Sequence, residues 1–357
     1  MNLSIDIQSL FPKLAVSENK PLSECTTFQL GGPCPLFIDK PSADQLPALI
    51  QMLNEKGMPF FVIGQGSNLV VSDDGLDCAV IRFCSETPKI EAGACHTSDA
   101  ITHPGLRPPL QRRGISTIPS TGGVPERRGG FPNSQNNNVV TVSGDTLLDD
   151  LALFTIEKEV GDLTFCSGIP GTVGGGIAGN AGAFGRQMGD HLISADILGL
   201  DGTARTVTPE ELDFSYRHSN LKETGEIVLS AIFELPFENK KTMRRERERI
   251  IQFRKKNHPD WHTTPCAGSV FRNIEPTSAV ERRKAAGYFL EEAGAKTMQV
   301  GGAHIFEKHA NMIVGGEGCT AQDVWILSEQ MKQAVQQKFD LELIREIRFL
   351  GRFRHDD

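Results

Sequence analysis

Apolar residues recur along the first part of the chain at two spacings, which predict alternating helices and strands. Residues 43–56 repeat leucine and isoleucine at helical spacing, and Gly57 marks the end of that helix. The short apolar runs at 59–64 and 78–83 are typical of buried strands. This alternation predicts layers of helix packed on sheet.

The same two spacings return after residue 138. Residues 139–144 form a predicted strand, and the leucines of 145–160 predict a helix capped by Asp145 or Thr146. Residues 195–212 predict a hairpin, because two strand-like runs flank an Asp-Gly turn. This region therefore resembles the first in mixing helix with sheet.

The last third of the chain has a different character. A strand is predicted at 226–235, followed by a highly charged helix at 242–257 that opens a second region. Two further helices are predicted at 279–294 and 321–339, and a strand at 341–351 closes the chain.

Residues 96–138 show neither spacing. The segment is rich in Pro, Gly, Arg, Ser and Asn, so we expect an insertion that forms a disordered surface loop. Its arginines suggest either contact with nucleic acid or a solvated loop. The solvated loop is favoured, because Phe131 is the one aromatic side chain there that is available for stacking on bases.

Composition narrows the class of protein. The chain has 357 residues, a net charge of -8 and a pI of about 5.7, which argues against a general nucleic-acid binder. The sequence shows neither a signal peptide nor a run of about 18 apolar residues, so we expect no membrane span. Its 8 cysteines form no CxxC pair, which fits reduced thiols in the cytoplasm.

Glycine gives the clearest functional signal. The segment GQGSN at 64–68 follows a predicted strand, and its backbone N–H groups are suited to phosphate, although a tight structural turn explains it equally well. It is not a Rossmann fingerprint, because the third glycine and the following helix are missing. The glycines of 168–185 are too dense for a turn alone and indicate backbone wrapped around a large flat cofactor.

These segments belong to a set of seven ordered motifs that resembles the UDP-N-acetylenolpyruvoylglucosamine reductase family. The motifs are TTFQLGGP (26–33), GQGSNLVVSDDGL (64–76), SGIPGTVGGGIAGNAGAFG (167–185), FSYRHS (214–219), AGSVFRN (267–273), EKHANMIV (307–314) and LELIREIRFLG (341–351). The resemblance covers nearly the whole chain except the insertion. The short spacing between Arg217 and Ser269 is similar to the type II subgroup, which lacks an extra tyrosine loop over the substrate.

The resemblance implies an α+β fold with a two-part FAD-binding domain of the vanillyl-alcohol-oxidase-like (PCMH) type and a smaller α/β substrate-binding domain. The expected division is 15–95 for the first FAD subdomain, 96–138 for the insertion, 139–237 for the second FAD subdomain, 238–340 for the substrate domain and 341–357 for the C-terminal strand and tail.

The implied activity is the NADPH-dependent reduction of an enolpyruvyl sugar nucleotide through FAD that is bound without a covalent link. Cys166 is accordingly expected to be structural. The expected cofactor-binding residues are Gly64, Gln65, Gly66, Ser67, Asn68, Gly168, Ile169, Pro170, Gly171, Thr172, Gly174, Gly175, Asn180 and Gly182.

Three side chains carry the chemistry that the resemblance implies. Arg217 would stabilise the substrate carboxylate and the developing enolate, Ser269 would donate a proton, and Glu346 would stabilise the enolic intermediate. Glu346 should have a raised pKa if it donates a hydrogen bond. From the residues alone, other readings stay open: a surface ion pair for Arg217, a turn cap for Ser269, and pairing of Glu346 with Arg345 or Arg348.

Four further residues, Tyr216, Arg254, Lys255 and Asn273, are candidates for contacts with the substrate. No metal site is expected, since Pro259 breaks any regular helix that would align His258 with His262.

Two other functions remain as alternatives. One is an FAD-dependent oxidase or dehydrogenase of the same fold, and the other is a nucleotide-binding protein without catalysis. A serine hydrolase is disfavoured, because the G-x-S-x-G pattern is absent from both candidate segments. We expect small-molecule partners only, a cytoplasmic location and a monomer.

Overall fold

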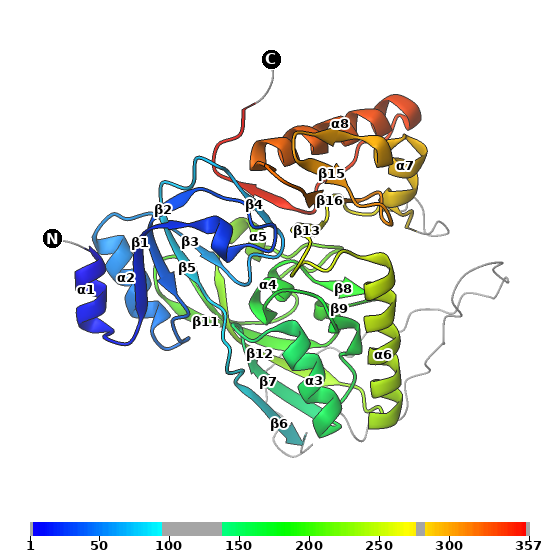
Figure 1. The fold of residues 1–357 in the computed structure, drawn as a ribbon. Helices are drawn as coiled ribbons and strands as arrows, with labels where there is room; N and C mark the ends of the chain where they lie inside the picture. The colour runs from blue at the N-terminus through cyan, green and yellow to red at the C-terminus, as the bar shows by residue number, and fades with distance from the viewer. Residues whose placement is uncertain (1–2, 95–137, 276–282, 355–357) are drawn as a thin grey trace.

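The computed structural model describes residues 3–94, 138–275 and 283–354 (Figure 1). The predicted insertion at 96–138 therefore lies outside the described residues, apart from Asn138, which begins a strand. Three sheets of four or five strands make up the frame, and helices pack against them.

The first sheet holds four strands in the order β1-β2-β5-β3. Its members are β1 (Ala15–Pro21), β2 (Pro33–Asp39), β3 (Phe60–Ile63) and β5 (Ala79–Arg82). Two helices belong to this part, α1 (Leu3–Leu10) and α2 (Leu46–Glu55), as does the 3-10 turn η1 (Leu22–Cys25). Strands β2 and β5 are parallel, as are β3 and β5, so the helix predicted at 43–56 is the crossover between parallel strands.

The second sheet holds five strands in the order β11-β10-β12-β7-β6. They are β6 (Ile90–Ala94), β7 (Asn138–Ser143), β10 (Leu192–Leu198), β11 (Ala204–Val207) and β12 (Ile227–Leu235). The predicted hairpin is confirmed, because β10 pairs with β11 in antiparallel register. Strand β6 pairs with β7, so the last strand of the predicted subdomain 15–95 belongs to the second sheet.

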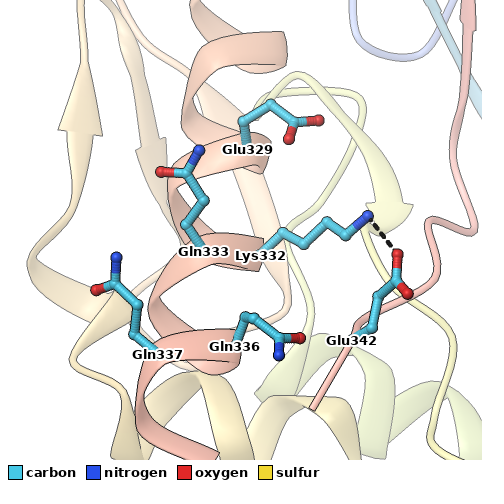
Figure 2. A pocket seen from close by; sticks show the side chains of 6 residues that line it. All are labelled: Glu329, Lys332, Gln333, Gln336, Gln337 and Glu342. Carbon is cyan, nitrogen blue, oxygen red and sulfur yellow. Dashed lines mark hydrogen bonds and ion pairs between the residues drawn. The ribbon is translucent and has the colours of Figure 1, made fainter. Parts of the chain in front are cut away.

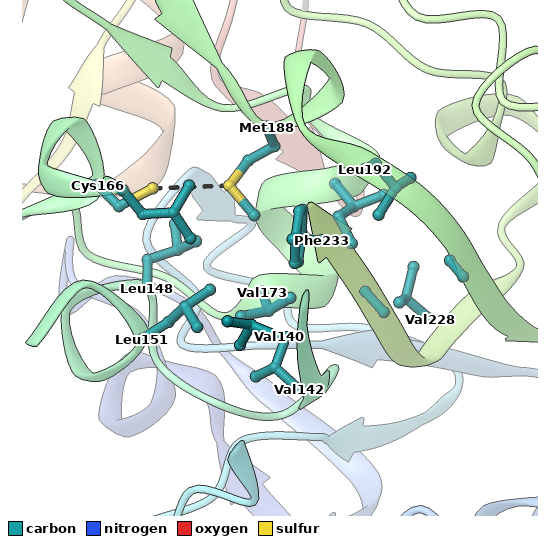
Figure 3. Close-up of a cluster of buried hydrophobic side chains, with 14 of the residues drawn as sticks. Val140, Val142, Leu148, Leu151, Cys166, Val173, Met188, Leu192, Val228 and Phe233 are labelled. Atoms are coloured by element: carbon teal, nitrogen blue, oxygen red, sulfur yellow. Dashed lines mark hydrogen bonds between the residues drawn. The ribbon is translucent and has the colours of Figure 1, made fainter. Parts of the chain in front are cut away.

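One face of the second sheet is covered by α3 (Leu148–Lys158) and the short α4 (Val173–Ala178). Figure 3 shows their buried side chains meeting those of the sheet, with Phe233 at the centre of the view. The predicted cap of α3 is wrong: Leu147 occupies the N-cap position. Asp145 instead accepts a 2.5 Å hydrogen bond from Ser143 Oγ, and the Thr146 carbonyl accepts from Val173 N.

A glycine-rich connection follows α4 and leads to the rest of the second sheet. It contains the hairpin β8 (Gly182–Ala183) with β9 (Arg186–Gln187) and the turn η3 (Met188–Asp190), whereas the turn η2 (Thr164–Cys166) lies between α3 and α4. Helix α5 (Leu221–Thr224) is a single turn just before β12.

The long helix α6 (Lys240–Asn257) opens the last region, as the charge pattern predicts. The third sheet has the order β13-β16-β15-β14, with β13 (Cys266–Ser269), β14 (Gln299–Val300), β15 (Ala303–Ile305) and β16 (Met312–Gly315). Helices α7 (Ala286–Glu292) and α8 (Ala321–Phe339) pack on it, and η4 (Ala295–Thr297) follows α7.

The chain returns to the first region at its end, where β17 (Arg348–Leu350) pairs in parallel with β4 (Leu69–Val71). The two regions are also joined by Asp73, whose carboxylate accepts from the backbone N–H groups of Ala321 and Gln322 at the start of α8. An aspartate at a helix N-terminus satisfies free donors there and opposes the positive end of the helix dipole. The C-terminal segment and the first glycine segment are thereby held together.

None of the helices in the described ranges is long and apolar enough to cross a membrane.

Candidate functional site

The two glycine segments, 95 residues or more apart in the sequence, contact each other directly. Gln65 Oε1 accepts a 2.6 Å hydrogen bond from Gly171 N, and Ser67 Oγ donates a 2.8 Å bond to the Pro170 carbonyl. A Cβ placed at Gly64 would come within 2.5 Å of Thr172 Oγ1, so the two backbones need a residue without a side chain there. The two glycine segments therefore lie side by side.

The first segment presents free backbone donors. Its tight turn is possible because Gly66 has a φ of +68°, and a side chain there would collide with the Cys25 carbonyl. Within the described residues, the backbone N–H groups of residues 65–68 donate no hydrogen bond, and these residues are partly or fully buried. Since buried donors without a partner cost free energy, this run of N–H groups fits an anion such as a diphosphate.

Side chains of α3 and α6 hold the backbone of the second glycine segment. Asp149 accepts a 2.8 Å bond from Gly168 N and holds the Arg247 guanidinium at 2.5 and 2.8 Å. Arg254 Nε donates to the Ser167 carbonyl at 2.9 Å. These contacts from α3 and α6 set the position of the backbone that is expected to wrap the cofactor.

Two of the residues expected to contact the cofactor serve the protein itself. Asn180 is fully buried, and its amide donates to the Ser215 carbonyl and accepts from Gly189 N, so its side chain braces the loop. The Gly182 carbonyl accepts a bond from the Arg217 guanidinium. Contact of either residue with the cofactor stays a prediction.

Arg217 and Glu346 meet as an ion pair. Arg217 Nε lies 2.7 Å from Glu346 Oε1, and their side chains keep 22% and 20% of their exposure, so one edge of the pair is open. Arg217 Nη2 donates a 2.7 Å bond to the Gly182 carbonyl. The structure thus excludes the pairing of Glu346 with Arg345, which instead bonds to Glu329.

Ser269 is joined to this pair through the backbone. It ends β13, and the carbonyl of the next residue, Val270, accepts a 2.7 Å bond from Glu346 N. The Glu346 carbonyl in turn accepts a 3.0 Å bond from the Asn68 side chain. The predicted proton donor, the predicted carboxyl group and the first glycine segment therefore lie in one place.

The Ser269 hydroxyl is not committed to any partner in the described part of the chain, and the residue is half-buried. A turn cap was the other reading of Ser269, and no hydrogen bond of that kind is formed. Gly268, just before it, has a φ of +79°, and a Cβ built there would meet nothing within 4 Å. The position of the Gly268 Cβ is therefore open.

Burial raises the pKa of the Glu346 carboxyl against the opposing effects of Arg217, Lys222 and Arg272. The predicted direction is confirmed, and burial is its cause. A carboxyl with a raised pKa can hold a proton and donate a hydrogen bond to an anion.

A cavity of about 490 Å³ is lined by residues that neighbour Arg217 and Glu346 in the sequence, Tyr216 and Ile344 among them, but by none of the three expected catalytic residues. Tyr216 and Asn273, both expected to contact the substrate, line it. Arg272 and Arg283 line it too, and sequence reasoning missed both; Arg283 stacks on Tyr216 with its guanidinium carbon 3.6 Å from the ring centre. Arg272 belongs to the AGSVFRN motif, which could have indicated it as a site residue.

Arg254 and Lys255 do not line this cavity. Arg254 lies between the second glycine segment and Arg217, close enough to Arg217 for the two charges to affect each other. Lys255 is exposed on α6. Their contact with substrate stays a prediction.

A second hollow of about 320 Å³ lies along α8 and carries no residue of the expected site (Figure 2). Glutamine and charged side chains line it, and Lys332 pairs there with Glu342 at 2.9 Å. In the ranges 3–94, 138–275 and 283–354, no cluster of three His, Cys, Asp or Glu side chains is arranged to hold a metal ion.

His258 packs between the rings of Phe253 and His309, with centroid distances of 5.9 and 5.7 Å. Burial and the charge of Arg254 lower its pKa to about 4. His258 therefore binds a proton more readily in the unfolded chain than in the folded one. As the pH drops from about 6.5 toward 4, the free energy of unfolding should fall by up to about 3 kcal/mol. Urea unfolding at pH 7.5 and 4.5 should show that the free energy of unfolding falls less for His258→Phe than for the native chain. For His262→Phe, a change at an exposed position, the free energy of unfolding should fall as much as it does for the native chain.

Gly175 offers a test of the cofactor surface that spares the fold. It is exposed, and a Cβ there would meet Thr172 Oγ1 at an ordinary 3.4 Å. Gly175→Ala should keep or slightly raise the stability of the cofactor-free protein, by about 0.5–1 kcal/mol, since it lies in a helix. Flavin affinity, measured by fluorescence titration, should fall at least about tenfold, a loss of about 1.4 kcal/mol. Gly93→Ala is the matched control, and equal flavin affinity in both variants would contradict the placement.

Comparison with known proteins gives a consistent result. The family model for the C-terminal domain of UDP-N-acetylenolpyruvoylglucosamine reductase matches residues 259–350. The UDP-N-acetylenolpyruvoylglucosamine reductase of Bacillus subtilis (strain 168) is 32% identical over 337 residues, which cover 94% of each chain. The protein of that name from Heliobacterium modesticaldum is 33% identical over 334 residues, 94% of this chain and 90% of its own.

Among solved structures, the crystal structure of UDP-N-acetylenolpyruvylglucosamine reductase from Thermus caldophilus is similar with a TM-score of 0.65 at 25% identity. The match covers 95% of this chain and 99% of that chain. The fold class expected from the motifs, an α+β flavin domain in two parts with a smaller substrate domain, is thereby confirmed.

Proposed function

Because this chain belongs to the UDP-N-acetylenolpyruvoylglucosamine reductase family, we propose that its cleft reduces the enolpyruvyl ether of UDP-N-acetylglucosamine enolpyruvate to the lactyl ether of UDP-N-acetylmuramate. This is a step in making peptidoglycan precursors. The enzyme is an oxidoreductase that uses FAD and NADPH.

The observation that carries the proposal is the Arg217–Glu346 ion pair, whose Glu346 backbone is bonded both to Val270, the neighbour of Ser269, and to Asn68 of the first glycine segment. An oxidase of the same fold needs the glycine segments but not this trio. A nucleotide-binding protein without catalysis needs neither the pair nor the free hydroxyl.

The residues present fit FAD. The free N–H groups of residues 65–68 would hold its diphosphate, and the backbone at 168–175 would lie along its ring system. FAD, when bound, would supply the hydride to the substrate, and NADPH would reduce the flavin again. Cys166 is fully buried and its pKa is raised to about 12, so the thiolate needed for a covalent link is disfavoured, in keeping with a non-covalent cofactor.

Arg217 binds the substrate carboxylate. Its guanidinium stays cationic and offers two parallel donors, which match the two oxygens of a carboxylate. When the carbon next to the carboxylate gains negative charge, the charge spreads onto these oxygens and the contact becomes stronger. The Gly182 carbonyl and Glu346 hold the guanidinium in place before the substrate arrives, so little reorganisation is needed.

Ser269 donates the proton that completes the reduction. Its hydroxyl makes no hydrogen bond within the described part of the chain, and the residue is half-buried. A hydroxyl is a weak acid in water, but the carbanion-like acceptor is strongly basic, so reach decides the role. Backbone bonding of Val270 to Glu346 fixes the distance from Ser269 to the ion pair.

Glu346 stabilises the enolic intermediate. Its raised pKa lets the carboxyl hold a proton when the substrate carboxylate lies near, so it can donate a hydrogen bond where an anion would repel. The cavity lined by Tyr216, Arg272 and Asn273 takes the sugar nucleotide. Arg272 would supply positive charge for a diphosphate, whereas Arg283 is paired with Glu275, which also lines the cavity, as does Glu342.

The finer assignments follow from this role. We place the enzyme in the cytoplasm, where nucleotide-linked precursors and NADPH are available, and expect a monomer of the type II form, with no tyrosine loop over the substrate. Light scattering tests the monomer directly.

The proposal is tested by incubating the purified protein with NADPH and the enolpyruvyl sugar nucleotide under nitrogen. Mass spectrometry should find a product heavier by two hydrogen atoms, in equal amount to the NADPH consumed. Oxygen uptake with simple alcohols would favour the oxidase, and colourless protein that leaves both compounds unchanged would favour the binding protein.

A further inference from the structure

A lysine outside the expected site holds the backbone of Arg217. Lys222 lies in the single turn of α5, and its Nζ donates a 2.7 Å hydrogen bond to the Arg217 carbonyl. The side chain is half-buried. Neither the motifs nor the expected chemistry assigned it a role.

The backbone of Arg217 requires support. Ser215 and His218 bond to each other through both backbone N–H groups, at 3.1 and 3.2 Å, so Tyr216 and Arg217 form a two-residue turn. Arg217 takes a φ of +58°, a left-handed conformation that is unfavourable for a residue with a side chain. Such strain at a site persists where surrounding contacts enforce it.

We propose that Lys222 is a positioning residue that keeps Arg217 in this left-handed turn and so aims its guanidinium at the substrate carboxylate. The proposal rests on the function given above. Arg217 is then fixed at three points: its carbonyl by Lys222, its Nη2 by Gly182 and its Nε by Glu346. If the bond from Lys222 is removed, the turn can relax, and the contacts of the guanidinium with Gly182 and Glu346 then shift.

The charges around Lys222 come from three parts of the chain. Arg217 lies in its own loop, Arg272 follows β13, and Glu346 and Arg348 lie on the C-terminal segment. Burial and the three arginines lower the pKa of Lys222 to about 8, although Glu346 opposes them. The ammonium therefore loses its proton just above neutral pH, where its bond to the carbonyl weakens.

Two variants separate position from charge. Lys222→Met keeps the length and loses the donor, whereas Lys222→Arg keeps a donor that does not titrate. Lys13→Met, at an exposed position, is the control. Each protein is assayed for flavin content, for flavin reduction by NADPH, and for single-turnover reduction of the enolpyruvyl sugar nucleotide between pH 6.5 and 9.5.

Lys222→Met should lower the single-turnover rate by about 10–100-fold, as expected for a small misplacement of a catalytic group. Flavin content and flavin reduction should stay within about twofold of the native protein, and Lys222→Arg should restore most of the rate. The native rate should fall above pH ~8, and Lys222→Arg should lack this fall. An unchanged rate in Lys222→Met, or equal losses in flavin content and both half-reactions, would overturn the proposal.

A crystal structure of Lys222→Met distinguishes the failure of this inference from failure of the proposed function. The inference predicts that Arg217 leaves the left-handed region and its Nε moves away from Glu346, whether or not the native protein turns over the sugar nucleotide. An Arg217 that keeps its φ of +58° and its 2.7 Å contact would overturn the inference even in an active enzyme.

Discussion

Ser269→Ala should still let NADPH bleach the bound flavin but should form product about 10²–10⁴-fold more slowly, the range for loss of a general acid. The change removes one oxygen atom and leaves β13, the open space at Gly268 and the bond from Glu346 N to the Val270 carbonyl intact. Rapid mixing separates the two half-reactions, since flavin absorbance falls in the first and recovers in the second.

Ser9→Ala, on the surface of α1, is the matched control and should behave like the native enzyme. Product formation by Ser269→Ala at the native rate would exclude Ser269 as the proton donor. Slow flavin reduction in the same variant would show that the hydroxyl acts in cofactor or NADPH binding instead.

Arg217→Gln should lower kcat/KM for the sugar nucleotide by roughly 3–4 kcal/mol of transition-state stabilisation, about 10²–10³-fold. The glutamine removes the cation and also leaves Glu346 without its partner at 2.7 Å. Arg217→Lys should recover little of the loss, since an ammonium cannot reach the Gly182 carbonyl, Glu346 and a carboxylate in the same geometry.

The control is Arg205→Gln, which breaks an exposed ion pair with Glu226 on the second sheet. Surface pairs of this kind contribute about 0–1 kcal/mol, so both activity and stability should stay nearly native. If Arg217→Gln changed KM alone and left kcat unchanged, the guanidinium would bind substrate and transition state equally. That result would remove its proposed role in stabilising the enolate.

Much of the fold followed from periodicity, because helices and strands with one buried face carry a regular apolar spacing. The errors fall where tertiary contacts override local pattern. Of the helix predicted at 279–294, residues 279–282 lie outside the described residues, and in the described part the helix begins at Ala286, since Lys284 pairs with Ile274 in a β-bridge. The strand predicted at 341–351 is reduced to Arg348–Leu350, because Arg345 first bridges to Phe271 as the chain crosses between regions.

The site was predictable only in part. Motifs identified Arg217, Ser269 and Glu346, and the structure brings them together through contacts that no local pattern contains. Lys222 was not predicted as a site residue, because a single lysine in a short turn shows no pattern in the sequence. Its bond to the Arg217 carbonyl is visible only in the structure. Asn180 is expected to contact the cofactor because it stands among glycines, but its bonds to Ser215 and Gly189 were not predictable from the sequence.

One absorbance experiment tests the central claim, that two glycine segments hold a flavin against the Arg217–Glu346 pair and Ser269. The purified protein should be yellow, should lose its flavin absorbance on addition of NADPH under nitrogen, and should regain it when one equivalent of UDP-N-acetylglucosamine enolpyruvate is added. A colourless protein, or a bleached flavin that the sugar nucleotide does not reoxidise, would contradict the account.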